Sequence, residues 1–239
     1  MNQERRRMLG RLTHTLGIGG IDLSLLDIAL THPSYAMEHH LGADNQRLEF
    51  LGDAVVDLLM GEYLFKAYPA DDEGKLTKMR ASLVCEEALS EAARRLALGD
   101  YLLLGRGEAA TGGATRPSNL ADAWEAMCGA IYLSCGAEVL KPVLEKYLSQ
   151  TIARVAGGYY GDYKTRLQEY IQREPDHTIT YELLEMAGPD HDRDFHVEVR
   201  IDDVAKGDGW GKSKKAAERE AALAALICYG VLPKVDEAL

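Results

Sequence analysis

The sequence predicts an all-α domain followed by a small α+β domain with the order α-β-β-β-α. Three observations lead to this fold class. Residues 1–155 carry long apolar-rich segments at helical spacing, residues 156–162 (AGGYYGD) are rich in glycine, and strand-like alternation begins only after them. We therefore expect one domain at 1–155, a Gly-rich linker at 156–162 and a second domain at 163–231.

Five segments of the first domain have the apolar spacing of helices. They span residues 22–32, 46–68, 76–98, 119–135 and 137–154. Between the third and the fourth, residues 105–117 (GRGEAATGGATRP) contain four glycines and a proline, which predicts a loop. The first domain should therefore be mostly helical.

The second domain should begin with a short helix at residues 163–173. Three strands are expected after it, at residues 178–186, 195–201 and 204–210. The second of these alternates apolar and polar side chains, and a Gly-Pro-Asp turn separates it from the first. An Ala-rich helix follows, with Ser213 as its N-cap and Gly230 as its C-cap.

Composition narrows the class of protein. With 239 residues, of which 46% are hydrophobic and 27% charged, the chain is not expected to be disordered or collagen-like. The net charge of −11 argues against coating nucleic acid through overall charge, but it leaves room for a local basic patch. No run approaches the roughly 18 apolar residues of a membrane span, and no secretory signal is evident.

The four cysteines lie far apart and form no CxxC pair. Cys128 and Cys135 are seven residues apart, so a helix would place them on one face, where a metal or disulfide role is conceivable. We expect buried free thiols in a reducing compartment instead. These features together predict a cytoplasmic protein with no membrane partner.

Two pairs of acids in apolar segments predict a metal site. Glu49 and Asp53 are four residues apart and share one face of a predicted helix, and Asp122 and Glu125 are three apart in another. Charge beside a core needs a partner, and two such pairs can converge into an oxygen-rich site for Mg²⁺. Two such ions about 4 Å apart would activate water and stabilise the leaving oxygen in phosphodiester hydrolysis.

One other interpretation of these acids stays open at this point, and a second is disfavoured. The segment with Glu49 and Asp53 can be an ordinary amphipathic helix with its acids on the solvated face. A di-iron carboxylate bundle also uses acids on facing helices, but it expects Glu-x-x-His motifs, which neither segment contains.

Four segments of the first domain form an ordered set of motifs: residues 30–36 (LTHPSYA), 47–55 (RLEFLGDAV), 72–84 (DEGKLTKMRASLV) and 120–126 (LADAWEA). This set resembles the motifs of the ribonuclease III family. The resemblance implies a Mg²⁺-dependent endoribonuclease, with Mn²⁺ as a possible substitute, that cuts double-stranded RNA to 5′-phosphate and 3′-hydroxyl ends. Roles in ribosomal RNA processing and structured-transcript processing follow only by analogy.

The resemblance also implies roles for individual residues. Glu49, Asp122 and Glu125 correspond to the metal ligands of the family. Asp53 and Glu125 correspond to its catalytic residues. Glu73 corresponds to an acid that supports the metal site or an RNA contact, although the residue pattern by itself favours a solvated loop acid.

Two further positions bear on metal affinity and assembly. Gln46 stands where the family often has Glu. Gln46, Glu49 and Asp53 are at positions i, i+3 and i+7, so the Gln46 side chain can still face the site. Because an amide carries no negative charge, the affinity for metal should be weaker. Phe50 corresponds to an aromatic residue that inserts into a partner subunit, which implies a homodimer. The residue pattern alone would place Phe50 in the core.

Three segments of the second domain resemble a double-stranded RNA-binding domain: residues 163–172 (YKTRLQEYIQ), 188–191 (GPDH) and 211–216 (GKSKKA). The implied RNA contacts are Thr165, Gln168, Glu169, His191, Lys214 and Lys215. The two lysines lie in the first turn of the last predicted helix, where unpaired N–H groups favour anions. Residues 161–230 carry 10 Lys and Arg against 15 Asp and Glu, so binding should be modest and salt-sensitive.

The alternative function is a non-catalytic protein that binds double-stranded RNA. The four acids at positions 49, 53, 122 and 125 argue against it, because a pure binding protein has no need of an acid cluster.

Overall fold

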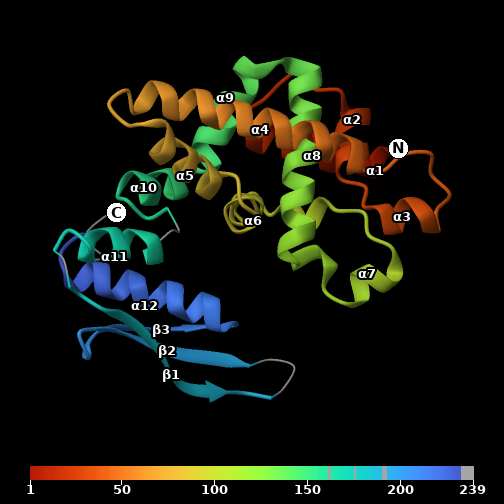
Figure 1. Ribbon diagram of the computed structural model, residues 1–239. Coiled ribbons are helices and arrows are strands. Elements are labelled where there is room, and N and C mark those ends of the chain that lie inside the picture. The colour runs from red at the N-terminus through yellow and green to blue at the C-terminus, as the bar shows by residue number, and fades with distance from the viewer. Residues whose placement is uncertain (161–162, 175, 190–192, 233–239) are drawn as a thin grey trace. The chain divides into compact units, whose positions relative to one another are not determined.

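The computed structural model of the protein describes residues 1–160, 163–174, 176–189 and 193–232. The chain divides into two compact units, Met1–Ile152 and Ala153–Leu239. The first unit is helical, and the second contains a three-stranded sheet between two helices in chain order (Figure 1). The predicted fold class is therefore confirmed, whereas the linker at 156–162 and the domain limits around it stay predictions.

The first unit is built from helices of very different lengths. They are α1 (Gln3–Leu16), α2 (Leu23–Ala29), α3 (Pro33–Glu38), α4 (Gln46–Ala67), α5 (Glu73–Leu83), α6 (Glu86–Arg95), the short 3₁₀ helix η1 (Leu98–Tyr101), α7 (Arg106–Ala110), the 3₁₀ helix η2 (Gly113–Thr115), α8 (Pro117–Cys135), α9 (Ala137–Tyr147) and the beginning of α10 (Ser149–Ala156), which continues past Ile152. Helix α8 runs through the core, where Trp124 is fully buried edge-on against Tyr147.

Several predicted boundaries differ from the observed ones. The segments 76–98 and 137–154, each predicted as one helix, are two helices each, and the predicted loop at 105–117 contains α7 and η2. The apolar period continues across the break at Cys85, whose backbone is extended, because the helices on both sides bury one face against the same core. Periodicity therefore reports burial and not the continuity of a helix.

The cysteines carry no disulfide. Cys128 is buried, and burial raises the pKa of its thiol. Cys85 and Cys228 are exposed, so the prediction of free thiols is confirmed but the prediction that they are buried is wrong for these two. Both lie at a helix end, at the N-cap of α6 and at the last residue of α12, where the helix no longer packs on the core.

Helices α4 and α8 touch through their backbones (Figure 1). A Cβ atom on Gly52 would lie 1.8 Å from the carbonyl oxygen of Glu125, and one on Gly129 would lie 2.5 Å from the carbonyl oxygen of Leu48. No side chain fits between helices at that distance, so glycine is required at both positions. The crossing therefore places the start of α4 directly against the middle of α8.

The second unit consists of α11 (Tyr163–Ile171), β1 (Ile179–Ala187), β2 (Asp194–Ile201), β3 (Val204–Gly211) and α12 (Lys214–Cys228). The strands are antiparallel in the order β1-β2-β3. The β2–β3 connection consists of Asp202 and Asp203, both with positive φ, as a tight hairpin turn requires. Val197 and Val199 of β2 are fully buried in the core that the sheet forms with α11 and α12.

Strand β3 lies close to α12 because every second residue of its latter half is a glycine. A Cβ atom on Gly207, Gly209 or Gly211 would come within 2.5–2.6 Å of a backbone nitrogen of α12. The run VAKGDGWG, which has weak strand propensity, is thus a strand because α12 packs directly on its backbone.

The α4–α8 contact generates a stability prediction. Gly52→Ala should lower the free energy of unfolding by at least about 1–3 kcal/mol, because the added methyl overlaps the Glu125 backbone and the helices must separate. Urea denaturation measures this change. The control is Gly10→Ala in α1, where an added Cβ meets no atom within 4 Å; helix propensity predicts a gain of up to about 1 kcal/mol there. Equal stability of the two variants would contradict the role of the crossing.

Candidate functional site

The α4–α8 crossing brings three carboxylates together. One ligand oxygen from each of Glu49, Asp122 and Glu125 lies within 4.8 Å of the other two, and all three residues are half-buried. Glu49 comes from the first turn of α4, and the two others come from α8. Among the residues that the structure describes, no other group of three or more potential metal ligands comes together in this way. We call these residues the three-acid cluster.

Asp53 lies beside the three-acid cluster without being part of it. It follows Glu49 by one helical turn on α4 and is exposed. Its negative charge helps to raise the pKa of Glu49 and of Glu125, so the carboxylate acts on the cluster at short range. This is the arrangement of a group that faces a site from its solvent side.

The cluster resists full ionisation when no cation is bound. Burial, followed by the charges of Asp53, Asp122 and Glu49, raises the pKa of Glu125 to about 8. Burial also raises the pKa of Glu49 and of Asp122, with added repulsion from neighbouring acids. Three carboxylates that repel one another in a partly desolvated site are an oxygen donor set for a hard divalent cation, which would neutralise the repulsion.

The two supporting residues predicted from the sequence lie at helix starts. Gln46 is the exposed first residue of α4, and its backbone nitrogen donates to the Asp44 carboxylate at 3.1 Å. Glu73 is the exposed first residue of α5, where its carboxylate accepts a hydrogen bond from the Thr77 hydroxyl at 3.0 Å. Neither belongs to the three-acid cluster, and the roles suggested for them stay predictions.

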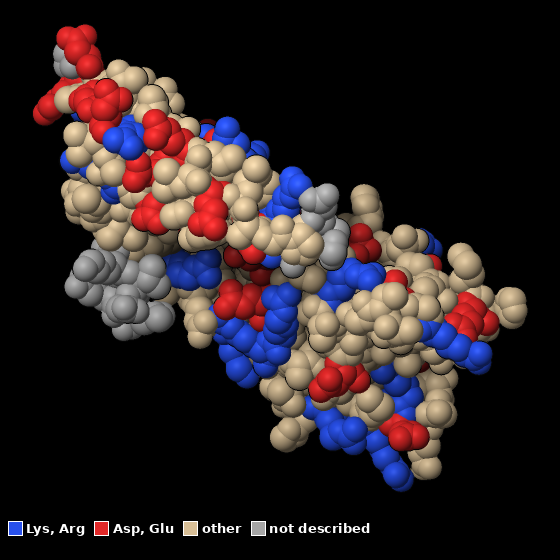
Figure 2. All heavy atoms as spheres, turned by 90° about the horizontal axis from the view of Figure 1, so that it is seen from below, with Lys and Arg blue, Asp and Glu red and all other residues tan. Residues whose placement is uncertain are grey.

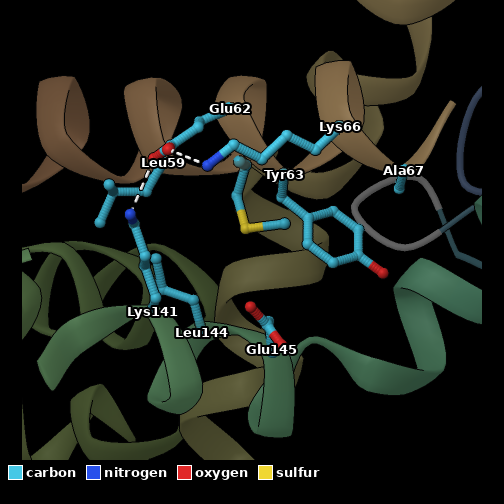
Figure 3. A pocket seen from close by; sticks show the side chains of 9 residues that line it. Leu59, Glu62, Tyr63, Lys66, Ala67, Lys141, Leu144 and Glu145 are labelled. Carbon is cyan, nitrogen blue, oxygen red and sulfur yellow. Dashed lines mark hydrogen bonds and ion pairs between the residues drawn. The ribbon is translucent and has the colours of Figure 1, made fainter. Parts of the chain in front are cut away.

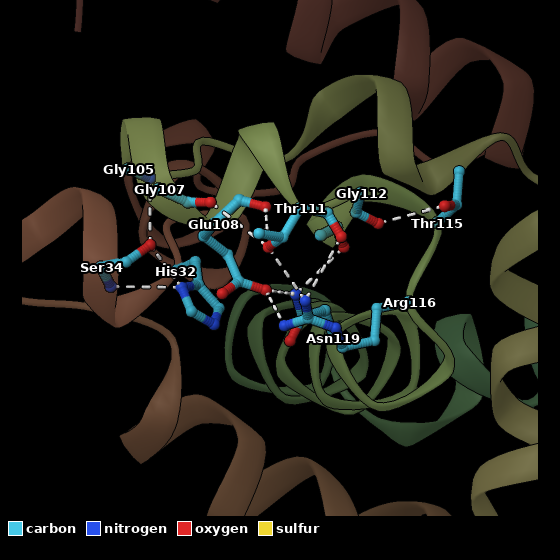
Figure 4. A network of polar contacts seen from close by, with 11 residues as sticks. His32, Ser34, Gly105, Gly107, Glu108, Thr111, Gly112, Thr115, Arg116 and Asn119 are labelled. Carbon is cyan, nitrogen blue, oxygen red and sulfur yellow. Dashed lines mark hydrogen bonds and ion pairs between the residues drawn. The ribbon is translucent and has the colours of Figure 1, made fainter. Parts of the chain in front are cut away.

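A polar network holds the chain that leads into α8 (Figure 4). The Glu108 carboxylate accepts a hydrogen bond from the Asn119 side chain at 2.7 Å and pairs with Arg116, and Asn119 also donates to the Gly113 carbonyl oxygen. No motif in the sequence marks these residues, because the glycines around them indicate only a loop. A half-buried acid that bonds the first turn of α8 fixes where the helix with Asp122 begins.

Phe50 lies on an exposed apolar stripe of α4. The side chains of Phe50, Leu58 and Phe65 are 80%, 67% and 72% exposed. Spacings of eight and seven residues place them on one face of the helix. Core burial, which the residue pattern alone favoured for Phe50, is therefore wrong for the single chain. A face of this kind is typical of a contact with another molecule.

The predicted RNA-contact residues of the second unit lie on the surfaces of its two helices. Thr165, Gln168 and Glu169 are exposed on α11. Lys214 and Lys215 are exposed in the first turn of α12, after the N-cap Ser213, whose hydroxyl accepts from the Ala216 nitrogen at 3.1 Å. His191 lies outside the described residues.

Lys214 and Lys215 differ from other lysines of this unit in their partners. Lys164 pairs with Glu218 at 2.6 Å, and Lys212 pairs with Asp194 at 3.1 Å. Within the described part of the chain, no acid pairs with either of the two lysines at the start of α12. On the face seen in Figure 2, basic and acidic side chains are interspersed.

A separate hollow lies between α4 and α9 and contains none of the clustered acids (Figure 3). Leu59, Met60 and Leu144 contribute apolar lining. At its rim Glu62 pairs with both Lys66 and Lys141, so these charges are already neutralised.

As for membranes, every helix in the described residues is too short or too polar to span a bilayer.

Comparisons with known proteins agree with both units. Residues 22–152 match a family model described as ribonuclease-III-like, and residues 163–227 match the double-stranded RNA binding motif. A protein named Ribonuclease 3 from Moorella thermoacetica is 46% identical over 231 residues, covering 97% of this chain and 99% of the relative. Another Ribonuclease 3, from Syntrophomonas wolfei subsp. wolfei, is 46% identical over 220 residues, covering 92% and 94%.

Among solved structures, a nuclease domain of ribonuclease III from Campylobacter jejuni is similar to the first unit. It aligns with a TM-score of 0.55 and 43% identity, covering 59% of this chain and 95% of that one. That structure was described for flexibility in a region involved in dimer formation.

The raised pKa of Glu125 predicts two opposite pH effects. The folded protein binds this proton more tightly than an unfolded chain with a pKa near 4.5, so the metal-free protein should lose stability as the pH rises from 4.5 to about 8. Divalent metal affinity should instead rise over this range, because the metal displaces the proton. Urea denaturation and calorimetric metal titration measure the two effects. Glu125→Gln should weaken both dependences, and pH-independent metal binding would contradict the assignment.

Proposed function

The chain belongs to the ribonuclease III family and is an endoribonuclease that acts on double-stranded RNA, and on that premise we propose that the three-acid cluster is its Mg²⁺ centre. The observation that carries the proposal is the convergence of Glu49, Asp122 and Glu125 within 4.8 Å at a partly desolvated helix crossing. Mn²⁺, which also accepts oxygen ligands, should substitute for Mg²⁺.

Each acid has a distinct part in this proposal. Glu49 and Asp122 hold the ion, and Glu125, the most strongly perturbed of the three, both holds it and gives up a proton when it binds. Asp53, which is exposed beside the cluster, would orient a water or the RNA backbone. A bound Mg²⁺ would activate a water to attack the phosphorus and would stabilise the 3′ oxygen as it leaves, so the products would carry 5′-phosphate and 3′-hydroxyl ends.

The second unit supplies the affinity for duplex RNA. We propose that Thr165, Gln168 and Glu169 of α11 contact a minor groove and that Lys214 and Lys215 bridge phosphates at the start of α12. The absence of acid partners for these two lysines among the described residues supports their part. The natural substrates proposed by analogy are ribosomal RNA precursors and structured transcripts in the cytoplasm.

We also propose that the protein works as a homodimer. The stripe of Phe50, Leu58 and Phe65 on α4 exposes a large apolar surface on the single chain, and a second copy of the same helix would cover it. Phe50 directly follows Glu49, so the dimer contact would lie next to the metal site. Two sites in one dimer would then cut the two strands of the duplex.

A pair of variants tests catalysis separately from binding. Glu125→Gln should reduce cleavage by more than the roughly 10–100-fold typical of losing an outer-shell partner, while duplex affinity stays unchanged. The double variant Lys214→Ala with Lys215→Ala should weaken binding and reduce the slope of log affinity against log salt by about 2. Cleavage of a labelled RNA duplex and fluorescence anisotropy measure the two effects. If Glu125→Gln cleaves the duplex as fast as the wild type, cleavage takes place at another site and the proposed metal centre is wrong.

The apolar stripe predicts the effect of a charge within it. Leu58→Glu should convert the dimer to a monomer, because a buried carboxylate without a partner is costly at the interface, and cleavage of both strands should fall. Sedimentation velocity reports the assembly. The matched control is Leu184→Glu, which changes an exposed leucine of the second unit. A wild-type protein that sediments as a monomer would refute the dimer.

A further inference from the structure

An ion pair joins the two helices that carry the proposed RNA contacts. Lys164 Nζ, in the first turn of α11, lies 2.6 Å from a carboxylate oxygen of Glu218 on α12. Close to this pair in the sequence, Leu167 and Ala217 are buried in the core that the two helices share (Figure 1). The Glu218 side chain is only 16% exposed, whereas that of Lys164 is 41% exposed. The acid of the pair is therefore the more deeply buried partner.

Tyr181 of β1 is the third member of this contact. The Lys164 ammonium lies 4.4 Å from the centre of the Tyr181 ring, within the range of a cation–π contact. Burial, followed by the charge of Glu218, raises the pKa of Tyr181 to about 12, so its hydroxyl stays neutral at physiological pH. A carboxylate and an aromatic ring therefore hold the ammonium of Lys164 in place.

The same carboxylate lies within reach of the two lysines proposed to bind RNA. Glu218 follows Lys214 by four residues and Lys215 by three on α12. Side chains at these spacings are neighbours on the surface of a helix, so either lysine could pair with the acid. Among the residues that the structure describes, Glu218 pairs with Lys164, and no ion pair joins it to either lysine of the first turn. A half-buried carboxylate needs a cation, and Lys164 supplies it from another helix.

We propose that Lys164 is a positioning residue for duplex binding: by occupying the Glu218 carboxylate, it leaves the two lysines at the start of α12 free for RNA phosphates. This inference rests on the proposed role of Lys214 and Lys215. It gives Lys164 a function without any contact of its own with RNA. It also accounts for a free basic site in a region, residues 161–230, that carries 10 Lys and Arg against 15 Asp and Glu.

Loss of the Lys164 charge should release the acid to the two lysines. Lys164→Met keeps an aliphatic side chain over Tyr181 but cannot pair with Glu218. The carboxylate should then turn to Lys214 or Lys215 and withdraw about one phosphate contact. Duplex affinity should fall roughly 5-fold at about 0.15 M salt, and the slope of log affinity against log salt should decrease by about 1. Lys164→Arg, which can still pair with the acid, should bind like the wild type.

A second substitution separates this mechanism from a direct RNA contact by Lys164. Adding Glu218→Gln to Lys164→Met removes the competing carboxylate, so affinity and salt slope should return to the wild-type values. If Lys164 itself touched RNA, the loss would persist in the double variant. The matched control is Lys206→Met, which removes a lysine held 5.5 Å from the ring centre of Tyr229, away from the start of α12. It should leave both quantities unchanged.

A double-mutant cycle separates pairing from a general effect of charge. The loss of affinity caused by Lys214→Ala with Lys215→Ala should be smaller in the Lys164→Met background than in the wild type, because one of the two lysines is already occupied there. Charges that act independently would give additive losses. Additive losses would overturn the positioning role.

Fluorescence anisotropy of the full-length protein with a labelled RNA duplex measures these effects, with a chelator present to prevent cleavage and below the lowest thermal midpoint of the variants. Lys214→Ala with Lys215→Ala is the reference. If the reference weakens binding but Lys164→Met does not, or if Glu218→Gln fails to restore the affinity, the positioning role is overturned and the lysine site stands. If the reference binds like the wild type, the lysine site fails and the positioning role fails with it.

Discussion

The backbone contact between α4 and α8 is the constraint on which the rest of the site depends. With glycines at positions 52 and 129, the two helices approach so closely that an acid on each can share one ion. The same approach removes water from around the carboxylates and strengthens their repulsion. Burial and this repulsion together raise the pKa of Glu125. Packing thus creates both the geometry of the site and its need for a cation.

The two units present different kinds of side chain to a polyanion such as RNA. The first presents carboxylates, which can approach phosphate only through a bound cation. The second leaves Lys214 and Lys215 without acid partners among the described residues, at a helix start that already favours anions. The net charge of −11 is the sum over the whole chain, so it limits non-specific attraction to RNA but says little about what either of these sites binds.

The sequence predicted the fold class and the convergent acids because both leave local marks: apolar periodicity, and acids spaced within a helical turn. It did not predict the breaks at Cys85 and Leu148, since burial of one face continues across them. It also missed Glu108 and Asn119, whose pairing depends on the folded path of a Gly-rich segment. The exposure of Phe50 was equally hidden, because an apolar side chain has the same pattern whether its neighbour is the core or another chain.

The alternating glycines of β3 divide its residues into two classes by the space around them. Gly207, Gly209 and Gly211 face α12 with no room for a Cβ atom, so any substitution there must disturb the packing of the domain. Asp208 and Trp210 lie between them, on the opposite face of the sheet, where Trp210 stacks on His196. Substitutions at positions 208 and 210 can therefore change that face of the sheet without disturbing the contact between β3 and α12.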